Sequence, residues 1–123
     1  MRRIALPIAA AILALAAAPV LAGGADVSGV EILRTGDNTY RFTVTVRHDD
    51  EGWDHYADAF VIESMDGEEL GRRTLHHPHV DELPFTRSLS GVTIPADHNT
   101  VTVRAHDSVH GFTGRGSTVI LPD

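Results

Sequence analysis

The stretch from Thr39 to Arg47 alternates strictly between apolar and polar residues and most restricts how this chain can fold. Its apolar members are Tyr40, Phe42, Val44 and Val46. A period of two is that of a β-strand with one face in the core and the other in water. We therefore expect this stretch to be a half-buried strand.

Similar short runs recur along the chain between turn residues, and nothing beyond residue 22 has a helical period. These runs are Val27–Leu33, His55–Ser64, Leu70–Leu75, Phe85–Leu89, Val101–Ala105 and Ser117–Leu121. With Thr39–Arg47 they give seven strands in about a hundred residues, a density typical of β-sandwiches. The sequence predicts an all-β, antiparallel, seven-stranded sandwich of the immunoglobulin-like or fibronectin type.

The first 22 residues have the pattern of a secretory signal peptide. Arg2 and Arg3 form a basic start, and Ile4–Ala22 is uncharged and mostly apolar, with small or aliphatic residues at its end. A membrane anchor is the alternative, since the run is nearly long enough to span a bilayer; its alanine content and late proline favour cleavage. We expect residues 23–123 to form one exported domain, periplasmic or secreted by a bacterium, with no membrane attachment after cleavage.

Composition narrows the partners of such a domain. The chain has 17 acidic and 10 basic residues, and two of the basic residues belong to the signal segment. This balance argues against nucleic acid and anionic membrane surfaces as partners. The chain has no cysteine, which excludes disulfides, haem attachment and thiolate metal sites.

The histidines are distributed unevenly over the predicted sandwich. Connections between successive antiparallel strands alternate between its two ends, so the second, fourth and sixth connections share one end. Seven of the eight histidines fall at that end, which we call the histidine pole. They are His48, His55, His76, His77, His79, His106 and His110. Only His98 falls at the other end.

Strand phase indicates which of these side chains point inward. His48 continues the inward face of Thr39–Arg47, and Asp107 continues that of Val101–Ala105, which turns His106 outward. His77 and His79 lie two residues apart and share a direction. The predicted inward metal ligands are His48, His55, His77, His79, His110 and Asp107, with Asp54, Glu82 and Arg87 around them. His76, His98 and His106 are expected to be solvated.

Imidazoles and carboxylates without a thiolate suit Zn²⁺ or Cu²⁺. No HExxH zinc-enzyme motif or nucleophile elbow is present, and Asp107, Ser108 and His110 are too close in sequence to act as a catalytic triad. We therefore expect a binding protein for metal delivery, buffering or sensing, and not an enzyme.

Two alternatives remain open at this point. The cluster can be a structural hydrogen-bond network of His, Asp and Arg in an interaction module, which presents Trp53 and an acidic loop to an unknown periplasmic protein or a glycan. The histidines can also act as a pH sensor. The chain is expected to be a monomer or a weak dimer.

Three motifs carry a resemblance to other proteins. The stretches GWDHYAD (Gly52–Asp58), HPHVDELPFTRSLSGV (His77–Val92) and HDSVHG (His106–Gly111) resemble a group of small exported proteobacterial hypothetical proteins. The resemblance implies a shared exported β domain. It implies no known activity, substrate or cofactor.

Overall fold

The computed structural model describes residues 24–123, which form seven strands and no helix; the predicted signal peptide lies outside this range. The strands are β1 (Asp26–Gly36), β2 (Thr39–Arg47), β3 (Ala57–Ser64), β4 (Glu69–Thr74), β5 (Phe85–Thr93), β6 (Thr100–Asp107) and β7 (Ser117–Ile120). All seven predicted strands are present. β2 matches its prediction residue for residue, whereas β5 ends at Thr93 rather than Leu89.

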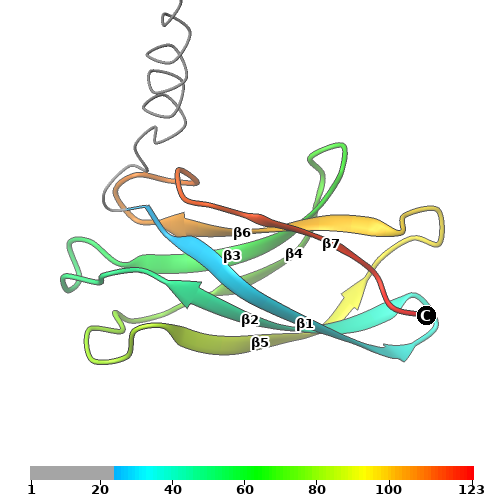
Figure 1. The fold of residues 1–123 in the computed structure, drawn as a ribbon, viewed down its shortest axis with the longest axis horizontal. Coiled ribbons are helices and arrows are strands. Elements are labelled where there is room, and N and C mark those ends of the chain that lie inside the picture. Colours follow the sequence, from blue (N-terminus) through cyan, green and yellow to red (C-terminus); the bar gives the residue numbers. More distant parts are fainter. Residues whose placement is uncertain (1–23) are drawn as a thin grey trace, which may run out of the picture.

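The strands form two antiparallel sheets that pack face to face (Figure 1). One sheet has the order β1-β2-β5 and the other the order β4-β3-β6-β7. This confirms the all-β sandwich. β4 pairs with β3, whereas in immunoglobulin constant-type domains the fourth strand joins the sheet that contains the first, second and fifth strands.

The core lies between the two sheets, as the period of two requires. Phe42, Val44 and Val46 of β2 are fully buried, and Val101 and Val103 of β6 are buried from the other sheet. Burying a large apolar side chain contributes roughly 1.5–3 kcal/mol, so these inward rows are the main source of stability. The polar residues between them face outward.

β3 does not show a clear alternation because it is buried on both faces. Phe60 and Ile62 belong to the core, while Val61 lies on the outer face between Arg72 and Arg104 of the neighbouring strands. A register shift against β6 near the start of β3 turns Ala57 inward as well. The bulge and the double burial explain why residues 57–64 show no clear period of two.

The three histidine-bearing loops lie at one end of the sandwich, as strand parity predicts (Figure 1). They are residues 48–56, 75–84 and 108–116, between β2 and β3, β4 and β5, and β6 and β7. Within the described range, no helix is long and apolar enough to cross a membrane.

Candidate metal centre

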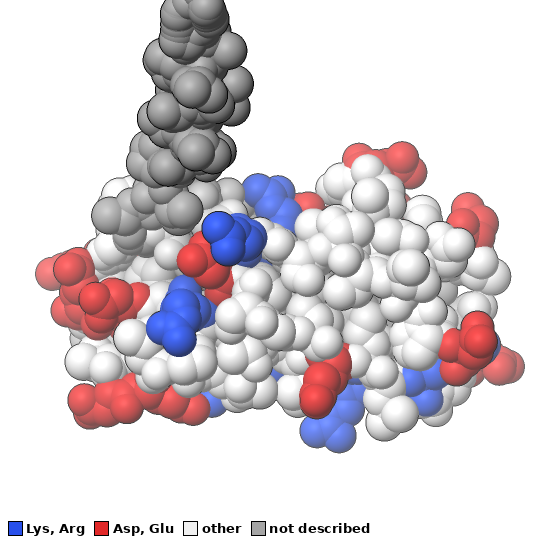
Figure 2. Space-filling model, viewed as in Figure 1, with Lys and Arg blue, Asp and Glu red and all other residues white. Residues whose placement is uncertain are grey.

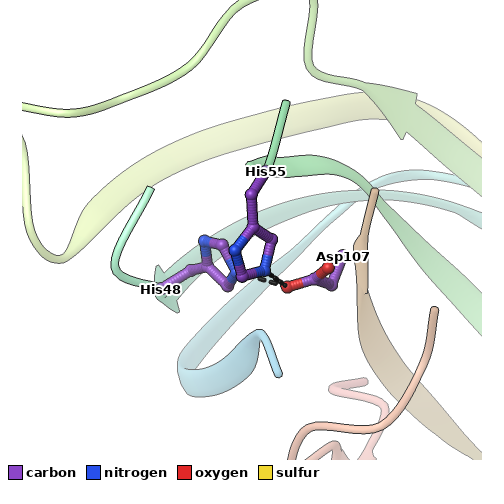
Figure 3. A group of neighbouring side chains, drawn as sticks. All are labelled: His48, His55 and Asp107. Carbon is purple, nitrogen blue, oxygen red and sulfur yellow. Dashed lines mark hydrogen bonds and ion pairs between the residues drawn. The ribbon is translucent and has the colours of Figure 1, made fainter. Parts of the chain in front are cut away.

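His48, His55 and Asp107 converge at the histidine pole (Figure 3). One potential ligand atom from each lies within 4.8 Å of the other two. His48 follows the last residue of β2 in the inward phase, and Asp107 is the last residue of β6. His55 is placed above them by the turn that pairs Gly52 with His55.

Asp107 holds the centre of this group, and each of its oxygens has a separate role. Its Oδ2 lies 2.5 Å from Nε2 of His48 and 2.8 Å from Nε2 of His55. Its Oδ1 accepts hydrogen bonds from the backbone N–H groups of Val109 (2.7 Å) and His110 (2.8 Å). Burial opposes ionisation of Asp107, but the two backbone donors and the two imidazoles outweigh it, and the pKa of this carboxyl lies below its ordinary value.

The second nitrogen of each imidazole faces another carboxylate. His48 Nδ1 contacts Oδ1 of Asp50, and His55 Nδ1 lies 2.7 Å from Oε1 of Glu51. A carboxylate on the far nitrogen is the usual support of a metal-binding histidine, since it fixes the tautomer and the ring orientation. Both rings are therefore oriented with Nε2 toward Asp107.

Asp50 also ties two loops together. Its Oδ1 accepts the backbone N–H of Ala57 at 3.1 Å, and its Oδ2 accepts the backbone N–H of His79 at 2.6 Å. Asp50 is only 5% exposed. A buried carboxylate needs such donors, because an unpaired buried charge is strongly destabilising.

The sequence did not identify Asp50 and Glu51 as site residues, because a run of three acidic residues resembles a solvated loop. A signal was nevertheless present for Asp50. The inward phase Val44, Val46, His48 continues to Asp50, and the side chain is buried accordingly.

His79 is buried but lies outside the converging group. Its ring stacks on Phe85 with centroids 4.0 Å apart, and its Nδ1 lies 3.6 Å from Oδ2 of Asp50, too far for a hydrogen bond. No residue of the described chain makes a hydrogen bond to this buried Nδ1. Burial, followed by the positive charge of Arg87, lowers the pKa of His79 below its ordinary value.

His77 and His110 are exposed rather than turned inward. The ring centroids of His110 and His55 lie 5.1 Å apart, and those of His77 and His79 lie 4.9 Å apart. Asp54 is exposed.

Glu82 and Arg87 pair with each other, with Nη2 of Arg87 3.0 Å from Oε1 of Glu82. This ion pair includes a second hydrogen bond, from Nη1 of Arg87 to Oε2 of Glu82 at 3.3 Å. It leaves both side chains beside the loop of residues 75–84 and separate from the converging group.

The other three histidines were expected to be solvated. His76 is exposed, while His98 and His106 are half-buried. His106 points away from the core and its Nδ1 lies 2.5 Å from Oδ1 of Asp58 on β3. Its direction was predicted correctly, but its carboxylate partner was not.

No protein-family model and no solved structure matches this chain. A curated relative from Halomicrobium mukohataei, described as a "Putative lipoprotein", is 41% identical over 95 residues, which is 77% of this chain and 46% of the relative. The chain thus spans about half the length of that relative.

Proposed function

We propose that this chain is an exported binding protein whose histidine pole binds one divalent transition-metal ion, Zn²⁺ or Cu²⁺. The ligands are His48, His55 and Asp107. Asp50 and Glu51 support the two imidazoles from their far nitrogens. The observation that carries the proposal is the convergence of two Nε2 atoms on one oxygen of Asp107, each ring having a carboxylate on its other nitrogen.

The number of protons that the two imidazoles carry supports a cation at this site. Four ring nitrogens face carboxylate oxygens, yet a neutral imidazole carries only one N–H. If each ring donates to Asp50 or Glu51, both Nε2 lone pairs point at the negative oxygen of Asp107. Two additional protons or one divalent ion would remove this repulsion.

A metal is favoured over protons by the chemistry of the donors. Two imidazoles and one carboxylate form a three-residue ligand set typical of zinc sites that keep a further position open. Ligand atoms around a tetrahedral Zn²⁺ lie about 3.3 Å apart for bonds of about 2.0–2.1 Å. The present separations from Asp107 Oδ2 are 2.5 and 2.8 Å, so binding requires the carboxylate to withdraw by less than about 1 Å.

Isothermal titration of residues 23–123 with Zn²⁺ and with Cu²⁺ tests the proposal. We expect a dissociation constant below about 10 μM, equivalent to roughly −7 kcal/mol, for one of these ions. Proton release on binding should appear as a dependence of the measured heat on the buffer's ionisation enthalpy. His55→Ala should abolish binding, and the matched control His98→Ala, at the opposite end, should retain it.

The second candidate is a structural network, in which the same contacts only brace three loops. It is favoured by the backbone donors that Asp50 and Asp107 accept from residues 57, 79, 109 and 110. Absence of binding to either ion below about 10 μM, with the fold intact, would establish this candidate in place of the metal site.

The proposal includes the cellular location of the protein, its class of function and the variant of its sandwich fold. The description of the 41% identical relative as a lipoprotein supports export or a place in the cell envelope, in line with the signal-peptide pattern. We propose a periplasmic or secreted protein that delivers, buffers or senses metal without catalysis. The order β4-β3-β6-β7 supports the fibronectin-type variant of the sandwich.

A further inference from the structure

We propose that the outer surface of the histidine pole docks a protein partner that presents basic side chains around an apolar centre. This goes beyond metal binding and does not require it. The surface consists of the outward side chains of the three loops, residues 48–56, 75–84 and 108–116.

Exposed apolar side chains gather on these loops. Among residues 24–123, seven large hydrophobic residues are exposed, and four of them lie here. They are Trp53 (68% exposed), Val80 (58%), Leu83 (48%) and Val109 (57%). Each loop contributes at least one. Exposed aromatic and aliphatic side chains that share one end of a protein are typical of an interaction site.

The loops that carry these exposed side chains are fixed to one another by hydrogen bonds. Tyr56 and Ser108 join two loops through two hydrogen bonds, from Tyr56 N to Ser108 Oγ (3.0 Å) and from Ser108 N to the Tyr56 carbonyl (2.9 Å). The Asp50 carboxylate joins the third loop through the N–H of His79. The Trp53 ring lies edge-on to that of Tyr56, with ring centroids 5.7 Å apart. The surface is thus preorganised, which lowers the entropy cost of binding.

The same loops are strongly acidic on the outside. The exposed carboxylates are Asp49, Glu51, Asp54, Asp81 and Glu82, against one arginine on these loops, Arg115. Acidic side chains lie at the end of the molecule where the loops lie, and others lie at the opposite end (Figure 2; compare Figure 1). A hollow of about 310 Å³ is lined by residues 77–82 and Arg87. Glu82 already pairs with Arg87, so the hollow gives a partner's basic side chain room beside Asp81.

Charge selects the partner. An anionic lipid surface and a second copy of this acidic pole would both be repelled. A protein surface with Lys or Arg around apolar residues matches both the carboxylates and the exposed apolar side chains of the loops. Complementary charge steers the association of such a partner and excludes others.

Trp53 supplies the assay, because it is the single tryptophan of the chain. The probe is a synthetic amphipathic peptide of leucine and lysine, and the control is the same peptide with glutamate in place of lysine. We expect the lysine peptide to shift the Trp53 emission to the blue and to bind at least tenfold tighter than the control. Binding should weaken several-fold between low and 0.3 M salt, and it should persist in EDTA, which separates this proposal from metal binding.

Two variants of equal charge decide whether the surface, and not the net charge, is responsible. The first is Asp49→Asn with Asp54→Asn and Asp81→Asn. The second, at the opposite end, is Asp37→Asn with Asp66→Asn and Asp97→Asn, all exposed. We expect the first variant to weaken lysine-peptide binding at least tenfold and the second less than threefold.

Three results would overturn the proposal. They are equal losses in the two triple variants, equal binding of the two peptides, and a Trp53 shift with phosphatidylcholine vesicles but not with the lysine peptide. The last result would identify a lipid surface as the partner.

Discussion

Replacing Asp107 by asparagine separates metal binding from the structural role of this side chain. The amide oxygen of the new residue can keep accepting the N–H groups of Val109 and His110, which now bond to Oδ1. The amide nitrogen would replace Oδ2 and face Nε2 of both His48 and His55. Its two hydrogens can satisfy two neutral imidazoles, but it cannot ligate a metal.

The expected size of the effect follows from linkage. With a dissociation constant of about 10 μM, 1 mM Zn²⁺ stabilises the folded wild-type chain by about 2.7 kcal/mol. In a domain of about 100 residues this raises the melting temperature by roughly 10–20 °C. A variant that loses one of three ligands and binds about 100-fold more weakly would gain only about 0.4 kcal/mol, or roughly 2–3 °C.

The measurement is thermal unfolding of both proteins at pH 8 in EDTA and in 1 mM Zn²⁺. In EDTA the free energy of unfolding of Asp107→Asn should lie within about 1 kcal/mol of the wild-type value if both imidazoles are neutral in the folded chain, since the amide hydrogens then satisfy them. Equal Zn²⁺ shifts in the two proteins would refute Asp107 as a ligand. Unfolding of the variant in EDTA would instead show that the fold needs this negative charge between protonated imidazoles.

Three other changes test separate parts of the structure. Glu51→Gln should lower Zn²⁺ affinity about tenfold by titration calorimetry, with little effect on folding, because the exposed carboxylate only supports a ligand imidazole. Gly114→Ala should destabilise by about 2–4 kcal/mol in urea unfolding, since an added Cβ would lie 1.9 Å from the Ala25 carbonyl oxygen; the control Gly36→Ala, with 3.9 Å to its nearest neighbour, should change stability by less than about 0.5 kcal/mol. The pKa of His79 is lowered in the folded chain, so as the pH falls the unfolded chain binds a proton at this side chain before the folded chain does. The free energy of unfolding that depends on His79 is therefore fully present above pH 6.5 and decreases as the pH falls below it. His79→Phe should make the free energy of unfolding less dependent on pH in this range.

Strand positions and the grouping of loops could be predicted because both depend on local pattern. A period of two identifies strands, and antiparallel pairing forces alternate connections to the same end. The end of β5 could not be predicted, because Gly91 at φ 70° lies in a bulge where β5 has an extra residue opposite Tyr40–Phe42. A glycine before a turn-rich stretch resembles the end of a strand.

The alternation of β2 and β6 predicts the part of the site that continues their inward faces. His48 and Asp107 continue inward faces and are buried, as expected. His77 and His110 lie in loops, where phase does not apply, and both are exposed. Asp50 continues the inward face of β2, whereas the contact of Glu51 with His55 depends on how the loop of residues 48–56 folds back on itself, which no local pattern encodes.

The inner and outer sides of the three loops are linked through the same residues, and this connects the two proposals. Asp107 Oδ1 fixes the backbone of Val109 and His110, while Oδ2 faces the imidazoles of the metal centre. A metal ion that is coordinated by Oδ2 therefore acts on Asp107, the residue that positions the exposed side chain of Val109. We expect Zn²⁺ to alter the affinity of the lysine–leucine peptide for wild-type protein and to leave it unchanged in Asp107→Asn, measured by Trp53 emission. By thermodynamic linkage, the peptide must then alter Zn²⁺ affinity by the same factor, which checks that both titrations are at equilibrium. A Zn²⁺ effect of equal size in Asp107→Asn would contradict a coupling through Asp107.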